Sequence, residues 1–468
     1  MKLRDTLSRQ LQPVTADDSG VVSVYSCGPT VYDYPHLGNW YAFLRWDLLI
    51  RTLRADGFKP VWVMNITDVG HLVSDGDEGE DKLAKKARSE RKTAYEVADF
   101  YTSYFLEALK RLNFTAPDHL PKASQHIEQQ ISLIEELEKK GFTYLIDDGV
   151  YYDTAKLADY GKLAKLDKEG VQAGARVEFN PQKRNATDFA LWKLTPANQV
   201  RDMEWDSPWG KGFPGWHLEC SAMCRHYLGQ PINIHAGGID HIPVHHTNEL
   251  AQSEAAYDRP LAKIWLHSDF ITVNGEKMSK SLNNFYTLED IEAKGYDLRV
   301  LRLAVFSVRY RSLADFNWDM MEAADRRLSR LQALSARRYQ LQGAGEADVL
   351  ASRLQTTLEE VGRELADDLN SPKALEKLDE VAQGLAAEKM PDAVKPHLEA
   401  FIREVDEIFG LKLSELADLR PEQRELLDKR AAAREVGDFN LGDRLREELS
   451  AGGIKVLDTD YGQIWRPS

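Results

Sequence analysis

The pattern of apolar and polar positions near the start of the chain predicts a strand, a helix and a second strand. Residues 22–26 alternate as in a half-buried strand, which the turn formers of 27–30 end. After His36 comes a helical stretch that carries Leu44, Leu48 and Leu53 on one side and ends at Gly57. The β-rich run 61–66 follows. This order predicts a parallel β-α-β unit whose ligands bind beyond the carboxyl ends of its strands.

A second pattern, from about residue 120, predicts an insertion between two halves of the same sheet. Ser124 is placed to cap a helix that shows Ile127, Ile134 and other apolar residues on one face and ends at Gly141. Strand-like pieces such as 149–152 follow, and the sequence to about residue 214 is rich in turns, aromatic residues and charges. Sheet-like sequence resumes at 232–235, just before two glycines that let the backbone approach something closely.

The second half of the chain has helical periodicity. Beyond about residue 290 it is rich in Leu, Ala, Glu and Arg, with an interruption near 343–345, and this predicts an α-helical bundle. A helix at about 439–449, two glycines and a short strand-like tail predict a small terminal module.

Composition excludes several classes of protein. The 468 residues carry 60 Lys and Arg against 75 Asp and Glu, a net charge of −15, which argues against binding nucleic acid through bulk charge but leaves room for a local basic surface. No apolar run approaches the roughly 18 residues that cross a bilayer, and the start lacks a secretory signal, so we expect a cytoplasmic protein with no membrane contact. Three cysteines are too few for a disulfide framework. We expect a monomer, because no exposed coiled-coil seam is evident.

Two segments carry candidate phosphate chemistry. Lys277 and Lys280 lie in the string Lys-Met-Ser-Lys-Ser after a turn-like Asn-Gly, and two ammonium groups on a loop suit a triphosphate that loses pyrophosphate. A solvated loop is the alternative. His36 and Asn39 flank Gly38 at the start of the first helix, where backbone N–H groups and the helix dipole favour phosphate. Taken alone, His36 is more typical of a capping or surface histidine than of a phosphate-binding one.

A candidate metal site combines residues from distant parts of the chain: Cys27, Cys220, His245 and Glu249. His245 and Glu249 are four residues apart on a predicted helix and therefore face the same way. Thiolate, imidazole and carboxylate together suit tetrahedral Zn²⁺. The alternative is that the cysteines are simply buried, which is also our interpretation of Cys224. The acidic run 75–81 is expected to be a solvated loop that could also bind a cation.

Longer strings carry a resemblance that covers nearly the whole chain. The segments 36–39 and 277–281 resemble the HIGH and KMSKS motifs of class I aminoacyl-tRNA synthetases, with Asn39 where His is common. The strings Cys-Gly-Pro-Thr-Val-Tyr-Asp (27–33), Asn-Ile-Thr-Asp (65–68), 188–193, 205–223 and 235–249 resemble the cysteinyl-tRNA synthetase family, as do 438–446, 458–459 and 465–466 near the end.

The resemblance implies a fold and a domain order. The fold is α/β, with a class I Rossmann-like parallel-sheet catalytic domain that holds an insertion, followed by an α-helical bundle and a small C-terminal anticodon-binding domain. The expected divisions are 1–120 and 215–265 for the two catalytic halves, 121–214 for the insertion, 266–320 for the lysine loop and stem-contact region, 321–410 for the bundle and 411–468 for the anticodon-binding domain.

It also implies the activity: ATP-dependent activation of L-cysteine and its transfer to the 3′ end of tRNA. One Zn²⁺ on Cys27, Cys220, His245 and Glu249 would select cysteine through its thiolate, and Mg²⁺ would accompany ATP. His36, Asn39, Lys277 and Lys280 would be catalytic. The implied ATP-binding residues are Gly38, Gly237, Gly238, Asp240, Met278 and Lys280; the substrate-binding residues are Thr67 and Trp216; the tRNA-binding residues are Trp465 and Arg466. The alternative for the last two is a tryptophan that anchors the end of the chain and an exposed arginine.

Two other functions stay open at this point. A cysteine–amino sugar ligase of thiol cofactor biosynthesis resembles the same catalytic half but lacks the terminal anticodon-binding module. A catalytically silent paralogue that binds RNA is favoured only by Asn39, which cannot be a cation, and is opposed by the intact lysine pair.

Overall fold

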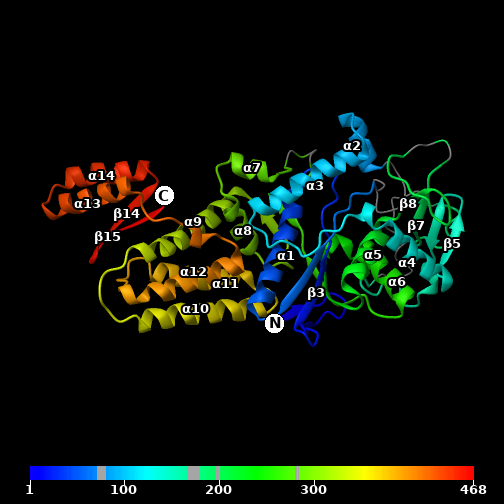
Figure 1. Ribbon diagram of the computed structural model, residues 1–468, viewed down its shortest axis with the longest axis horizontal. Helices are drawn as coiled ribbons and strands as arrows, with labels where there is room; N and C mark the ends of the chain where they lie inside the picture. Colours follow the sequence, from blue (N-terminus) through cyan, green and yellow to red (C-terminus); the bar gives the residue numbers. More distant parts are fainter. Residues whose placement is uncertain are drawn as a thin grey trace. The chain divides into compact units, whose positions relative to one another are not determined.

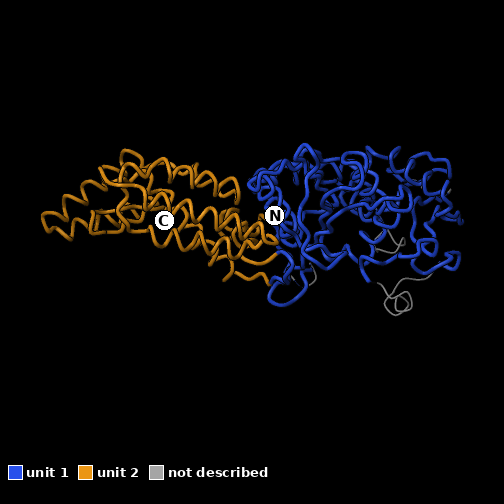
Figure 2. The backbone as a smooth tube through the Cα atoms, turned by 90° about the horizontal axis from the view of Figure 1, so that it is seen from below, with its two compact units in different colours: residues 1–287, 310–314 blue, residues 288–309, 315–468 orange. Residues whose placement is uncertain are grey.

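The computed structural model describes residues 1–70, 81–165, 180–196, 198, 201–279, 282 and 284–467. Lys280 and residues 75–80 of the acidic run therefore lie outside the described residues. The chain forms two compact units, residues 1–287 with 310–314 and residues 288–309 with 315–468 (Figure 2). None of the described helices combines the length and apolar character that crossing a membrane requires.

The first unit contains a four-stranded parallel sheet, whose strand β3 is labelled in Figure 1. Its strands, in spatial order, are β10 (Ala262–Ser268), β9 (Ile232–Gly238), β3 (Val21–Ser26) and β4 (Lys59–Met64). Val24 pairs with Trp62 on one side and with Ile234 on the other. The predicted β-α-β unit is confirmed, with α1 (Leu37–Ala55) between β3 and β4. Strand order reverses between β3 and β9, which is where a doubly wound sheet opens a crevice for ligands.

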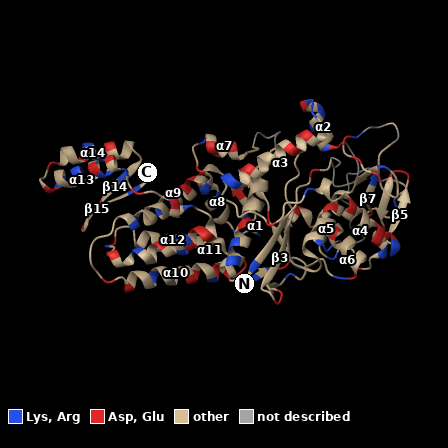
Figure 3. Ribbon diagram, viewed as in Figure 1, with Lys and Arg blue, Asp and Glu red and all other residues tan. Residues whose placement is uncertain are grey.

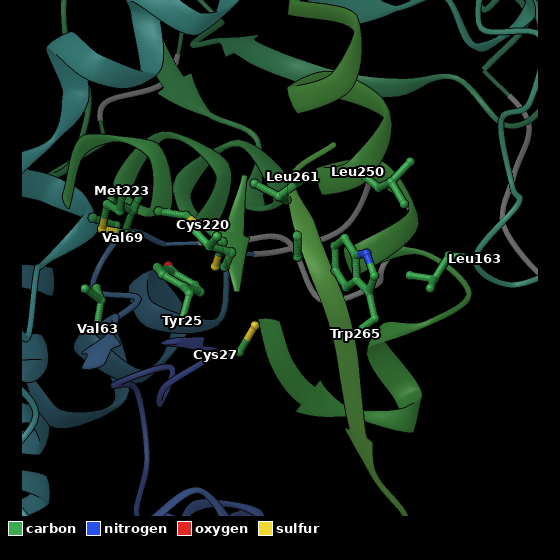
Figure 4. Close-up of a cluster of buried hydrophobic side chains, with 14 residues drawn as sticks. Tyr25, Cys27, Val63, Val69, Leu163, Cys220, Met223, Leu250, Leu261 and Trp265 are labelled. Carbon is green, nitrogen blue, oxygen red and sulfur yellow. The ribbon is translucent and has the colours of Figure 1, made fainter. Parts of the chain in front are cut away.

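Two helices, one before and one after β9 in the chain, pack against the sheet. Tyr25 and Val63 pack with Cys220 of α5 (Trp216–Leu228) and Leu250 of α6 (His245–Tyr257) in one buried cluster (Figure 4). This cluster joins elements about 200 residues apart, so the carboxyl ends of β3 and β4 are fixed beside the starts of both helices.

The insertion forms its own antiparallel sheet after α4 (Ile127–Lys139): β5 (Thr143–Ile146), β6 (Gly149–Tyr152), β7 (Phe189–Leu194) and β8 (Gly212–Pro214). The expectation that Ser124 caps this helix is wrong. Its backbone N–H and hydroxyl donate instead to the carboxylate of Asp68, at 2.8 and 2.6 Å, and α4 starts after His126 without a side-chain cap. A buried carboxylate from a distant loop thus takes the hydroxyl away from its local helix.

The other elements of the first unit are β1 (Lys2–Arg4), β2 (Leu11–Pro13), α2 (Lys82–Glu90), α3 (Ala94–Arg111), β11 (Ile271–Val273) and β12 (Glu276–Lys277). Asp81 accepts from the backbone of Leu83 and Ala84 and so caps α2. Between β11 and β12, Asn274 and Gly275 both have positive φ, 51° and 79°, as a tight hairpin turn requires.

The second unit confirms the predicted helical half. It contains α7 (Leu288–Ala293), α8 (Leu298–Phe306), α9 (Trp318–Ala336), α10 (Asp348–Ala366), α11 (Ser371–Gly384) and α12 (Lys395–Phe409), then α13 (Pro421–Glu435), α14 (Phe439–Ala451) and the hairpin β14 (Ile454–Thr459) and β15 (Gly462–Pro467); β13 is Ala314–Phe316. Leu427, Leu449 and Trp465 join Ala336 of α9 in a shared core.

Candidate active site

The four predicted metal ligands meet at the carboxyl edge of the parallel sheet. Cys27 follows β3, Cys220 lies in α5, and His245 and Glu249 lie one turn apart in α6. Their candidate ligand atoms all lie within 4.8 Å of one another, and all four side chains are buried. Cys27 and Cys220 occur together in the buried cluster of Figure 4.

The donor set fits Zn²⁺. Two sulfurs, one imidazole and one carboxylate make four ligands of the kind that zinc binds in a tetrahedron. The Glu249 carboxylate is 0% exposed, and neither oxygen accepts a hydrogen bond of good geometry, although imidazole nitrogens of His235 and His245 approach to 2.6 and 2.9 Å. A buried carboxylate of this kind needs a cation. His217 Nδ1 lies 2.9 Å from His245 Nδ1, which leaves Nε2 of His245 for a metal.

Neighbouring charges shift the pKa values of these ligands in opposite directions. Burial alone would raise the pKa of Glu249, but the nearby His235 and His245 hold that pKa well below its usual range. Burial opposes protonation of His245, yet the Glu249 carboxylate raises the pKa of His245 to about 10. A hydrogen bond from the Cys220 thiol lowers the pKa of Cys27 well below its ordinary value.

Sequence reasoning missed a second layer of histidines. His246 Nε2 lies 3.3 Å from the Cys27 sulfur, and His246 Nδ1 lies 2.8 Å from His267 Nε2. His267 Nδ1 in turn lies 2.7 Å from the hydroxyl of Thr6. In the sequence, the adjacent His245 and His246 were the feature that could have predicted this second layer. A Cβ on Gly237 would lie 2.5 Å from His246 and 2.8 Å from His241, so the close approach at this glycine is to imidazoles.

Thr67 and Trp216 are the two residues predicted to line the amino-acid pocket, and Trp216 contacts this cluster directly. The Trp216 ring centroid lies 4.5 Å from that of His245. Thr67 pairs with the loop after Cys27, because its N–H donates to the carbonyl of Pro29 and its carbonyl accepts from Val31. Asn65, which the sequence did not single out for a role, links the two segments: it donates to the Thr67 hydroxyl at 3.0 Å and accepts from Gly28 at 2.9 Å.

His36 and Asn39 form the N-terminal cap of α1. His36 Nδ1 accepts from Gly38 N–H at 3.0 Å, and the Asn39 side-chain oxygen accepts from His36 N–H at 3.0 Å. A Cβ on Gly38 would lie 2.7 Å from the His36 ring, so this position requires glycine. A substrate contact by Asn39 would therefore use its amide Nδ2–H groups.

The lysine loop is attached to this cap. Leu37 N–H donates to the carbonyl of Tyr286 at 2.9 Å, and the ring of Phe285 lies edge-on to that of His36, 5.2 Å between centroids. Asn284 braces the loop itself: its side chain accepts from Ser279 N–H at 2.7 Å and donates to the Lys277 carbonyl at 3.1 Å. Lys277 is exposed and Met278 is buried. Asn284 was another residue that the sequence did not single out.

Asp240 is exposed and follows β9, within the turn that leads to α6. A Cβ on Gly238 would lie 2.1 Å from an Asp240 carboxylate oxygen, so Gly238 makes room for that side chain. The carboxyl edge of the sheet thus carries the sulfur and imidazole cluster, the capped helix start and an exposed carboxylate.

Comparison with known proteins settles the family. The model described as tRNA synthetases class I (C) catalytic domain matches residues 13–326, and the one described as cysteinyl-tRNA ligase anticodon binding domain matches residues 416–466. Cysteine–tRNA ligase 1 of Burkholderia lata is 44% identical over 99% of this chain and 96% of its own, and the cysteine–tRNA ligase of Thermococcus gammatolerans is 37% identical over 100% and 99%.

The chain belongs to the cysteine–tRNA ligase family. It is an ATP-dependent aminoacyl-tRNA synthetase, and the sugar ligase and silent-paralogue alternatives are not supported. A solved structure, methionyl-tRNA synthetase of Mycobacterium tuberculosis with methionyl-adenylate, has a TM-score of 0.59 over 86% of this chain and 95% of its own at 15% identity. This likeness confirms the class I fold.

The two predicted tRNA contacts of this ligase differ in exposure. Trp465 is 3% exposed, stacks on Tyr339 at 6.5 Å, and exchanges two backbone hydrogen bonds with the Gln340 side chain. Its ring therefore anchors β15 beside the end of α9, as the alternative of a chain-end anchor expects. Arg466 beside it is exposed.

Proposed function

We propose that this cysteine–tRNA ligase holds one Zn²⁺ through Cys27, Cys220, His245 and Glu249. The observation that carries the proposal is the convergence of these four buried donors, two of them thiols, beside Thr67 and Trp216. When bound, Zn²⁺ supplies a soft position for the substrate thiolate, which the hydroxyl of serine fills poorly.

The protein groups around the site have separate tasks. His217 orients His245, and His246 holds the Cys27 sulfur in place. Trp216 covers His245 and helps to exclude water from the amino-acid side chain. Thr67, fixed by Asn65, lines the same pocket. These contacts orient the cysteine carboxylate toward ATP, and catalysis by positioning of this kind needs no acid or base on the enzyme.

We assign the nucleotide to the part of the carboxyl edge that carries the start of α1 and Asp240. His36 and the amide N–H groups of Asn39 bind phosphate or ribose oxygens, and Asp240 accepts from ribose hydroxyls, with Gly238 giving it space. The carboxylate attacks the α-phosphorus, and Lys277 with Lys280 stabilises the leaving pyrophosphate. In the second step a terminal ribose hydroxyl of tRNA attacks the activated carbonyl and AMP leaves. Mg²⁺ accompanies ATP, with no side chain assigned to it.

The decisive experiment is cysteine-dependent ATP–pyrophosphate exchange with serine as competitor, followed by charging of tRNA. We expect exchange with cysteine and very little with serine, loss of exchange after chelation, and recovery with Zn²⁺. Equal exchange with both amino acids would contradict the zinc assignment while leaving the family unaffected.

We also propose a cellular compartment and an oligomeric state for the enzyme. All three cysteines are free and buried, which suits a reducing compartment such as the cytoplasm. We propose a monomer, which sedimentation velocity across a range of concentrations tests directly.

A further inference from the structure

A second set of metal-binding side chains overlaps the four-residue site. Cys27, His241 and His246 offer ligand atoms that also lie within 4.8 Å of one another. Neither histidine belongs to the ligand set proposed above, yet one sulfur and two imidazoles are ligands that Zn²⁺ accepts. Cys27 is the one residue that both sets share. An ion on its sulfur can therefore exchange its other ligands without leaving the protein.

Each imidazole of the second set has a nitrogen that an ion can bind. His241 Nδ1 is buried and makes no hydrogen bond of good geometry in the described part of the chain, which is costly unless a ligand satisfies the nitrogen. His246 Nε2 lies 3.3 Å from the Cys27 sulfur. Gly237 leaves room for both rings, because a Cβ there would lie 2.5 Å from His246 and 2.8 Å from His241.

His246 has the supporting contacts of a metal ligand. Its Nδ1 lies 2.8 Å from His267 Nε2, and His267 Nδ1 lies 2.7 Å from the Thr6 hydroxyl. When each ring donates toward Thr6, His246 Nε2 keeps its lone pair for an ion. The hydroxyl can also donate, and the chain of hydrogen bonds then runs the other way and lets His246 donate to the Cys27 sulfur. Both rings are neutral in either direction, so His246 can be a ligand first and a donor to Cys27 afterwards.

The ligand sets differ in number and in exposure. Four protein ligands complete a tetrahedron around Zn²⁺, whereas three leave a position for water and so allow exchange. All members of the four-residue site are buried, and so are those of a third possible set, His235, His246 and Glu249. His241 is half-buried and ends the turn between β9 and α6. It is thus the one member of these three sets that is not buried.

The charge of the chain favours the approach of a cation to this position. The net charge is −15, and acidic residues are distributed over helices of both units (Figure 3). Asp240, which directly precedes His241, is an exposed carboxylate. A hydrated divalent ion is therefore attracted to the chain and meets an exposed carboxylate next to a half-buried imidazole.

We propose that Cys27, His241 and His246 form an entry site that receives Zn²⁺ from solvent and passes it to the four-residue site. The ion stays on Cys27 while the other three ligands of that site replace the two imidazoles. Its charge does not change, and Cys220 releases its thiol proton to solvent as it binds. This route depends on the zinc assignment proposed above and adds the way in which a buried site is loaded.

Uptake of Co²⁺, a spectroscopic substitute for Zn²⁺, tests the entry site in the full-length enzyme after a chelator has removed its metal. In stopped flow, the sulfur-to-cobalt charge-transfer absorbance should rise in two phases, first with one thiolate and then, more strongly, with two. His241→Ala removes one of the three entry ligands and should slow uptake at least about tenfold. Release of Zn²⁺ to a chromophoric chelator should slow by the same factor, because entry and exit share one route. The equilibrium affinity for Zn²⁺ should therefore stay unchanged.

Further variants separate the entry site from general damage to the fold. His241→Cys places another metal-binding group at the same position and should recover most of the uptake rate. Thr6 is not a ligand in any of the three sets. Thr6→Val should slow uptake about fivefold, the effect of one neutral hydrogen bond, and Thr6→Ser should not. His226→Ala is the matched control, because His226 is an exposed histidine of α5 that belongs to none of the three sets, and it should load at the original rate.

The results distinguish failure of the entry site from failure of the zinc assignment. Uptake and release that are equally fast in His241→Ala and His226→Ala would overturn the entry site. Weaker equilibrium binding with faster release in His241→Ala would make His241 a ligand of the resting site, which also overturns the proposed route. Failure of the unchanged enzyme to bind Zn²⁺ at equilibrium would instead contradict the zinc assignment itself.

Discussion

Asn284→Ala tests whether the lysine loop must be held in one conformation for catalysis. Asn284 is 9% exposed and makes two hydrogen bonds, at 2.7 Å from Ser279 N–H and at 3.1 Å to the Lys277 carbonyl. A neutral hydrogen bond contributes about 1 kcal/mol net, so losing both should destabilise the ordered conformation of the loop by about 2 kcal/mol. At 1.4 kcal/mol per factor of ten, the rate constant for cysteine-dependent exchange should fall about 30-fold.

The KM for cysteine should stay close to its original value, because the amino-acid pocket is built on other segments. Asn233→Ala is a suitable control: Asn233 is also 9% exposed, accepts from Ser23 N–H at 2.8 Å and donates to the Thr15 carbonyl at 2.6 Å, at the start of β9 and away from the carboxyl edge. It should lower the melting temperature and leave exchange unchanged. Wild-type exchange in Asn284→Ala, or equal loss in both variants, would refute the reasoning.

Three further changes test other parts of the structure. Glu249→Gln removes the one charged oxygen ligand and should weaken zinc binding at least about tenfold in a competition with a chromophoric chelator; unchanged affinity would exclude Glu249 as a ligand. Asn39→Ala breaks the cap of α1 and should cost about 1 kcal/mol in calorimetric stability, which Asn39→Asp largely retains. Asp458→Asn weakens the pair with the fully buried Arg430, at 2.8 and 2.9 Å, and should cost about 1.5–3 kcal/mol. The hydrogen bond from Arg430 lowers the pKa of Asp458. The pair therefore stabilises the fold at pH values above the ordinary pKa of aspartate, and this stabilisation disappears as pH falls through the lowered pKa of the folded state. Thermal unfolding measured at decreasing pH should show this loss in the unchanged enzyme and not in Asp458→Asn.

Periodicity and family motifs predicted the parts of the fold that depend on local sequence. The alternation at 22–26 and the leucine spacing after His36 correspond to β3 and α1. Parallel strands end at one edge, so residues just after β3 and β9 had to meet there, whatever their separation in sequence. Cys27, which follows β3, and His245 and Glu249, on the helix after β9, converge at that edge for the same reason. Cys220 comes from α5, which precedes β9, and reaches the edge by packing in the buried cluster with Cys27.

What the sequence could not predict depends on partners from distant segments. Ser124 looks like a helix cap until Asp68 takes its hydroxyl. The sequence leaves Trp465 with either a base-stacking or an anchoring role, and only its contacts with Tyr339 and Gln340 favour the anchor. Asn284 looks like an ordinary loop residue until its amide bridges Lys277 and Ser279. In each case a side chain with several possible partners is fixed by the contact that burial makes costly to lose.

At the start of α1, a local helix cap and a contact from a distant loop together determine which groups can bind substrate. The N–H groups of Leu37, Gly38 and Asn39 already donate to Tyr286, to the His36 ring and to the His36 carbonyl. The start of α1 therefore has no first-turn N–H left for phosphate, and stabilisation of charge must come from side chains. The Asn39 oxygen accepts from the His36 N–H, and in this exposed side chain the Nδ2–H groups are the neutral donors. An asparagine can thus cap the helix and donate to substrate at once, which explains why its lack of positive charge is compatible with an active site.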